Sequence, residues 1–165
     1  MNDDIFEKPY FSEEMIFKSV PAQNEFINLA KEYARKYSLD KAMPIGSVLV
    51  NKGDIIGIGA NGSDYHNNHI CERVRQKIPT GQGYELCEGC HPKNHSEQKA
   101  IQDAIKKGNK TEGTDLYLWG HWWCCRWCMN AIKKAGIKNV FLLEKSEILF
   151  NKNKSGNIIN RQFDS

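Results

Sequence analysis

The sequence predicts a layered α/β domain, with helices packed against one sheet. Two observations predict it. Apolar residues recur first at helical and then at strand spacing along the chain, and glycine or proline residues separate the segments. The resulting order is helix, hairpin, helix, strand, helix, strand, an alternation typical of helices layered on a sheet. The length of 165 residues fits one domain, so we expect residues 1–165 to form a single unit.

The first half of this pattern contains a helix and a hairpin. Residues 1–20 show no clear periodicity and predict a loosely held arm. Apolar residues spaced by three and four predict a helix over 22–37. Two short apolar runs, 45–50 and 55–59, flank the turn residues 51–54 and predict an antiparallel hairpin.

The second half predicts two helix–strand pairs. A helix is expected over 96–107 and a strand over 116–119, followed by a helix over 125–135 and a strand over 137–143. The tail over 151–165 is polar, and we expect its end to fray.

A long polar insert over 60–94 interrupts the pattern. A segment of that length without secondary structure is unusual in a compact domain, so we expect it either to have a function or to be held together by a metal ion. Cys71, Cys87 and Cys90 lie within it and suit a structural zinc site. His66, His69 and His91 are the candidates for the fourth ligand, and we predict a site formed by Cys71, Cys87, Cys90 and His91. The Cys-x-x-Cys-His pattern at 87–91 also fits haem attachment, which would require export.

Composition limits the partners and the compartment. The formal net charge is +3, from 23 basic and 20 acidic residues, which is too balanced to indicate nucleic-acid binding. No run of about 18 apolar residues predicts a membrane span. Residues 1–10 lack the apolar core of a signal peptide, so we expect a cytoplasmic protein. Cytosolic thiols stay reduced, which favours metal binding over disulfides for the six cysteines.

Two short motifs carry the chemistry, and each opens a predicted helix. His95 and Glu97 form a His-x-Glu motif, and Cys125 and Cys128 form a Cys-x-x-Cys motif. Two thiolates and one imidazole supply three zinc ligands, and a tetrahedral ion then keeps its fourth position open for water. Glu97 lies two residues after His95, so it need not be a ligand and can act as the general base and acid.

The chain resembles the cytidine and deoxycytidylate deaminase family, which carries His-x-Glu followed by Pro-Cys-x-x-Cys. The likeness extends to the segments 44–50, 55–57, 61–62, 131–132 and 135–137, and it covers a core of about 22–145. It implies a three-layer α-β-α fold with a five-stranded mixed sheet, zinc-dependent hydrolytic deamination and a homo-oligomer. It also implies that Asn61 contacts the sugar of the substrate.

The insert is similar in layout to that of deoxycytidylate deaminases, which implies conversion of dCMP to dUMP with release of ammonia. Arg73 in the insert is the candidate for the substrate phosphate, because a guanidinium matches its oxygens; a solvated loop charge is the alternative. Trp123 belongs to a tryptophan-rich segment, 119–127, that either packs in the core or stacks on a flat base.

Some positions depart from the family pattern. Cys124 stands where the family has proline, and it could compete with Cys125 as a metal ligand. The segment 119–123 is longer and more aromatic than the pattern implies, which leaves the substrate open. The alternatives are another small base, a nucleoside or a cytosine-bearing antibiotic. A catalytically silent, zinc-stabilised binding module is a further alternative, of a different class.

Overall fold

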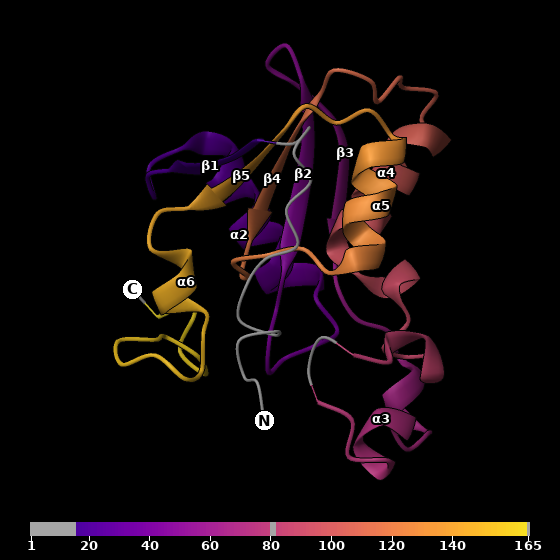
Figure 1. Ribbon diagram of the computed structural model, residues 1–165. Coiled ribbons are helices and arrows are strands. Elements are labelled where there is room, and N and C mark those ends of the chain that lie inside the picture. The colour runs from indigo at the N-terminus through magenta and orange to yellow at the C-terminus, as the bar shows by residue number, and fades with distance from the viewer. Residues whose placement is uncertain (1–15, 80–81, 165) are drawn as a thin grey trace.

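The sheet has five strands in the order β1-β5-β4-β2-β3 (Figure 1). The computed structural model describes residues 16–79 and 82–164. The strands are β1 (Ile16–Val20), β2 (Gly46–Asn51), β3 (Asp54–Ala60), β4 (Asp115–Trp119) and β5 (Asn139–Leu143). β2 runs antiparallel to β3 and β4, whereas β5 is parallel to β4 and β1, so the sheet is mixed.

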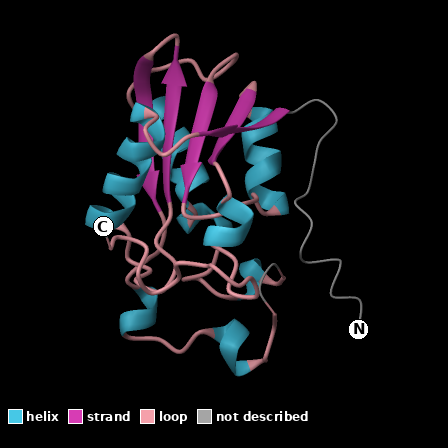
Figure 2. Cartoon of the chain, turned by 90° about the vertical axis from the view of Figure 1, so that its left-hand side faces the viewer, coloured by secondary structure: helices cyan, strands magenta, loops and turns pink. Residues whose placement is uncertain are grey.

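Helices cover both faces of the sheet, as Figure 2 shows. Helix α2 (Glu25–Tyr37) packs on one face, against a core that includes Val48 and Val50. Helices α4 (Ser96–Lys106) and α5 (Arg126–Lys134) pack on the other face, against a core that includes Leu49. Successive residues of a strand point to opposite faces, so β2 contributes to both cores. The three-layer α-β-α prediction is confirmed.

Glycines in β3 bring helix α4 close to the sheet. A Cβ atom on Gly59 would lie 2.6 Å from the backbone oxygen of Ser96 and from the nitrogen of Ala100. A Cβ atom on Gly57 would lie 2.3 Å from the oxygen of Ala100. The first turns of α4 therefore rest on the strand at a distance that only glycine permits.

The structure corrects one expectation about the ends of the chain, and the other falls on a residue that is not described. The loose arm is wrong for residues 16–20, which form an edge strand whose backbone pairs with β5; residues 1–15 lie outside the described residues. The tail after helix α6 (Ser146–Leu149) folds back through a series of turns. Its Phe163 ring stacks on Trp119 with centroids 5.2 Å apart, and Gln162 donates to the carbonyl of Ala42. Ser165, where fraying was expected, is not described.

Apart from residues 80 and 81, which are not described, the insert contains only short helices. They are η1 (Tyr65–Asn67), α3 (Glu72–Arg75), η2 (Tyr84–Leu86) and η3 (Pro92–Asn94). The insert and the tail lie at the same end of the molecule in Figure 1. Within the described ranges, no helix has the length and apolar character needed to cross a membrane.

Candidate active site

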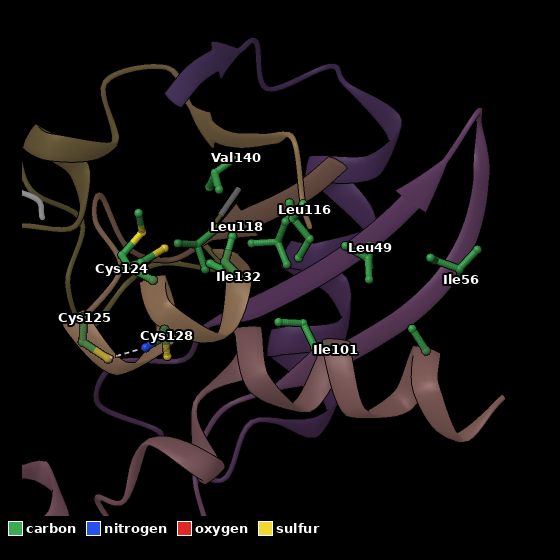
Figure 3. Packing of buried hydrophobic residues seen from close by; sticks show 13 residues of the cluster. Leu49, Ile56, Ile101, Leu116, Leu118, Cys124, Cys125, Cys128, Ile132 and Val140 are labelled. Atoms are coloured by element: carbon green, nitrogen blue, oxygen red, sulfur yellow. Dashed lines mark hydrogen bonds between the residues drawn. The ribbon is translucent and has the colours of Figure 1, made fainter. Parts of the chain in front are cut away.

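Three metal-ligating side chains meet where helices α4 and α5 begin. His95 and Cys125 are the N-cap residues of α4 and α5, and Cys128 lies one turn into α5. The Nδ1 atom of His95 is 3.4 Å from the Sγ atom of Cys125 and 3.4 Å from that of Cys128. Cys125 Sγ also accepts a hydrogen bond from the Cys128 backbone N–H (Figure 3). The two sequence motifs therefore lie next to each other in the structure.

The donor set fits zinc. One imidazole nitrogen and two sulfurs lie within 4.8 Å of one another, which is close enough for a single ion to contact all three. A side-chain hydrogen bond with the Cys128 thiol is the main cause that lowers the pKa of Cys125 to about 5; burial opposes this, and His95 reinforces it. Cys125 thus favours the thiolate, the form that binds a metal, whereas the same bond and burial raise the pKa of Cys128, whose proton a metal would displace on binding.

Glu97 is a buried carboxylate beside these ligands. It lies on the first turn of α4 and is only 6% exposed, and burial raises its pKa. Its Oε2 atom accepts from Ser96 Oγ at 3.3 Å, and the two hydroxyls of Ser96 and Ser47 lie 2.7 Å apart. Glu97 is not in the ligand group, so its carboxylate remains available to hold or move a proton.

Cys124 is turned toward Glu97 and stands outside the ligand group. It is fully buried, and its side chain hydrogen-bonds to the carboxylate of Glu97. Burial raises the pKa of Cys124 well above its ordinary value, so it stays a thiol and donates. The residue that replaces the family's proline thus contacts the carboxylate and not the three ligands.

A cavity of about 720 Å³ opens onto this group. Its wall includes His95, Glu97 and Cys125, together with the segment 121–123. The remaining wall comes from the loop near Lys41, from the insert and from the tail after α6, including Phe150 and Lys152. The tail residues gave no sequence signal, because nothing in a polar segment indicates which cavity it folds against.

Asn61 and Arg73 line the cavity, but protein atoms already engage both. The side-chain oxygen of Asn61 accepts from Ser38 Oγ and from the backbone of Ile45, and its amide donates to Met43. Arg73 donates to two loop carbonyls and to a cysteine sulfur: Pro79, Gln82 and Cys90. Both side chains therefore organise loops around the cavity.

Trp123 also lines the cavity and packs against the core behind it. Its indole Nε1 is buried and has no hydrogen-bond partner among the described residues. The stacking role predicted for its ring stays a prediction. His121, in the same segment, also lines the cavity.

A second cluster lies in the insert. The structure brings together His66, Cys71, Cys87 and Cys90, whose ligand atoms all lie within 4.8 Å of one another. His66 Nε2 is 3.2 Å from Cys87 Sγ, and the sulfurs of Cys71 and Cys90 are 3.5 Å apart. Although burial opposes it, the hydrogen bond with His66 helps to lower the pKa of Cys87 to about 6.

The histidine of this cluster is His66, whereas the sequence predicted His91. His91 lies outside the group, and its Nδ1 accepts a hydrogen bond from the backbone N–H of Lys93. His69 stacks on Tyr65 with ring centroids 4.2 Å apart. Three histidines in one loop are equivalent in sequence, and only the turns of the backbone select His66.

Comparison with known proteins gives the class of this chain. The family model described as the cytidine and deoxycytidylate deaminase zinc-binding region matches residues 21–144. The chain belongs to this family and is a zinc-dependent hydrolytic deaminase. A search among curated proteins finds no match.

Solved structures of several deaminases are similar to it. The dCMP deaminase of cyanophage S-TIM5 is 22% identical, with a TM-score of 0.48, over 73% of this chain and 82% of the other. The guanine deaminase of Bacillus subtilis is 24% identical, with a TM-score of 0.45, over 73% of this chain and 64% of the other. A deaminase from a study of A-to-I editing by tRNA:A34 deaminases is 23% identical, with a TM-score of 0.43, over 85% of this chain and 87% of the other.

Proposed function

We propose that the protein deaminates a cytosine nucleotide, converting dCMP to dUMP with release of ammonia. The observation that carries the proposal is the buried Glu97 carboxylate, adjacent to three zinc-type ligands inside one cavity of about 720 Å³. That volume falls in the range of small-molecule sites. Basic side chains at Lys41, Arg73 and Lys152 also line the cavity and suit an anionic substrate.

In this proposal His95, Cys125 and Cys128 hold the zinc ion. When bound, zinc supplies Lewis-acid chemistry that lowers the pKa of a water molecule. Glu97 takes one proton from the attacking water and delivers it to N3 of the substrate ring, and it then carries the second water proton from the new C4 hydroxyl to the leaving amine. A C4–O bond forms, the C4–N4 bond breaks, and ammonia leaves. The Ser96 hydroxyl and the Cys124 thiol hydrogen-bond to the carboxylate and hold it in place.

Arg73 supplies the phosphate contact in this proposal. A guanidinium has five N–H donors, and the bonds to Pro79, Gln82 and Cys90 use three of them. In this proposal the remaining two donate to the substrate phosphate. Because the loop carbonyls fix the guanidinium, little side-chain entropy is lost on binding.

The test is a substrate panel with matched variants. Zinc-loaded protein is incubated with deoxycytidylate, deoxycytidine, cytosine, guanine and adenosine while ammonia is followed. Glu97→Gln keeps the shape of the side chain but cannot carry the proton, so it should lose at least about 100-fold in rate. Arg73→Ala should slow deamination of the nucleotide more than that of the nucleoside. Turnover of guanine alone would instead support the alternative of another small base. Failure of every substrate would support the silent module.

We further propose that the insert cluster of His66, Cys71, Cys87 and Cys90 binds a second, structural zinc ion. One imidazole and three thiolates form a closed four-ligand set of the structural type. The proposal predicts two zinc ions per chain. Cys87→Ser and Cys128→Ser should each remove one of the two, and only Cys128→Ser should abolish deamination outright. A wild-type content of one zinc would contradict it.

Homo-oligomerisation and a cytoplasmic location also stay predictions. Light scattering of the zinc-loaded protein tests the first, and fractionation of the source cells tests the second.

A further inference from the structure

His121 lies two residues after the end of β4, directly after Gly120, and three contacts hold its ring. Its Nδ1 atom accepts a hydrogen bond of 3.2 Å from the backbone N–H of Trp123. The imidazole stacks on Trp122 with centroids 4.6 Å apart and planes at 1°. The Trp123 ring meets the imidazole nearly edge-on, with centroids 5.0 Å apart. The ring therefore has one fixed orientation.

The backbone hydrogen bond also fixes the tautomer. A backbone N–H can only donate, so Nδ1 of His121 must be unprotonated. Burial lowers the pKa of His121 to about 4, so the ring is neutral at physiological pH. The single ring proton is consequently on Nε2. Within residues 16–79 and 82–164, no acceptor is found for this Nε2–H donor.

The unused donor belongs to the wall of the cavity. His121 is partly exposed and lines the same cavity as Glu97 and His95. A preorganised N–H group without a protein partner costs no rearrangement when a ligand supplies the acceptor. Among bases, the acceptor must be a ring carbonyl or ring nitrogen, because an exocyclic amine would place a second donor against the first.

We propose that His121 is a specificity-determining residue, whose Nε2–H donates a hydrogen bond to the ring carbonyl oxygen of a pyrimidine in the cavity. The inference rests on the proposed function, since it assumes that the ring carbon to be attacked faces Glu97. A buried donor that is left unpaired is costly, so the same N–H disfavours rings that present a donor at this edge.

Binding of a non-reacting ligand tests the inference independently of turnover. Deoxyuridylate retains the ring carbonyl, and 2-deoxyribose 5-phosphate lacks the base altogether. His121→Phe should bind deoxyuridylate about 10-fold more weakly than the wild type. It should bind the sugar phosphate equally well, which shows that the cavity is intact. His121→Gln retains an N–H donor and should recover part of the loss. Equal deoxyuridylate binding by the wild type and His121→Phe would overturn the inference.

Nitrogen NMR of the imidazoles provides a second measurement that does not depend on a variant folding. Histidine-labelled wild-type protein should show the Nε2–H tautomer at His121. Its Nε2 resonance should move on addition of deoxyuridylate but not of 2-deoxyribose 5-phosphate. An Nδ1–H tautomer, or an unmoved resonance, would overturn the inference. Deamination of deoxycytidylate without this NMR response would support the proposed function and overturn the role of His121. The NMR response without deamination would support the role of His121 and contradict the proposed function.

Discussion

The ring of Tyr84 meets the imidazole of His95 edge-on, with ring centroids 5.0 Å apart and planes at 85°. The same tyrosine contacts Trp127 of helix α5 at 5.8 Å, and the guanidinium of Arg73 lies 4.4 Å from its ring centroid. Arg73 in turn hydrogen-bonds to Cys90 of the insert cluster. One aromatic side chain therefore joins the insert to a zinc-type ligand of the candidate active site.

Removal of the Tyr84 ring should loosen His95. Aromatic pairs contribute about 0.5–1.5 kcal/mol beyond their buried area, so Tyr84→Ala should weaken zinc binding about 3- to 10-fold. Competition with a chromogenic chelator measures this affinity. Tyr84→Phe keeps the ring and serves as the control. Equal zinc affinity of Tyr84→Ala and the wild type would show that His95 is oriented without the ring.

Substitution of Asn61 should act on stability. Its amide joins Ser38, Met43 and Ile45, and the residue is only 8% exposed. Asn61→Ala should lower the free energy of unfolding by about 1–3 kcal/mol, because buried partners lose their hydrogen bonds. Urea unfolding measures the change. A raised KM with unchanged stability would instead support the contact with the substrate sugar.

Gly59 should be intolerant of a single methyl group. Gly59→Ala places a Cβ atom 2.6 Å from the backbone of Ser96, next to Glu97. Such overpacking typically costs about 1–3 kcal/mol, and the shift of α4 should also lower kcat. Thermal unfolding and initial rates measure the two effects. Gly53→Asn is the matched control: a Cβ atom there meets nothing within 4 Å, and asparagine tolerates its φ of +86°.

Burial of a neutral His121 should make stability depend on pH. Its pKa is about 4 in the folded chain and 6.5 in the ordinary imidazole, and burial is the main cause of the difference. Between these values the unfolded chain binds the extra proton, so the free energy of unfolding falls as the pH is lowered from 6.5 to 4. His121→Gln lacks this proton equilibrium.

Urea unfolding of both zinc-loaded proteins at about pH 7.5 and pH 5 measures the effect, because these values bracket the ordinary imidazole pKa. The stability of the wild type relative to His121→Gln should be lower at the acidic value. Loss of zinc at low pH affects both proteins, so it cancels in the comparison. A difference that is the same at both pH values would show that His121 titrates as in a free peptide.

The fold and the family could be predicted from the sequence because short-range patterns encode them. Helix α4 was expected over 96–107 and spans Ser96–Lys106, and the hairpin lies where its turn residues placed it. The edge strand β1 was missed because its five residues, with one lysine and one serine among them, carry too short an alternation. Its pairing with β5 depends on a partner more than a hundred residues away.

For the candidate site, the sequence predicted the metal-ligating residues but not the loop residues that surround them. His95, Cys125 and Cys128 were identified because each ligand type stands at a helix start, and the structure brings the three together. Selection of His66 over His91, and the turn of Cys124 toward Glu97, depend on loop paths and rotamers that no spacing encodes. Their roles, and that of Glu97, remain predictions for the experiments above.

The tail after α6 has a consequence for engineering. The metal-type ligands and the carboxylate lie between residues 95 and 128, whereas Phe150, Lys152 and Ile159 close part of the cavity from beyond the family-matching region. Libraries randomised over 152–159, which leave the buried Phe150 and Asn151 in place, should therefore vary the admitted molecule while every reacting group keeps its place in the chain. Tail exchange between relatives becomes a practical route to new substrate ranges on an unchanged chemical centre.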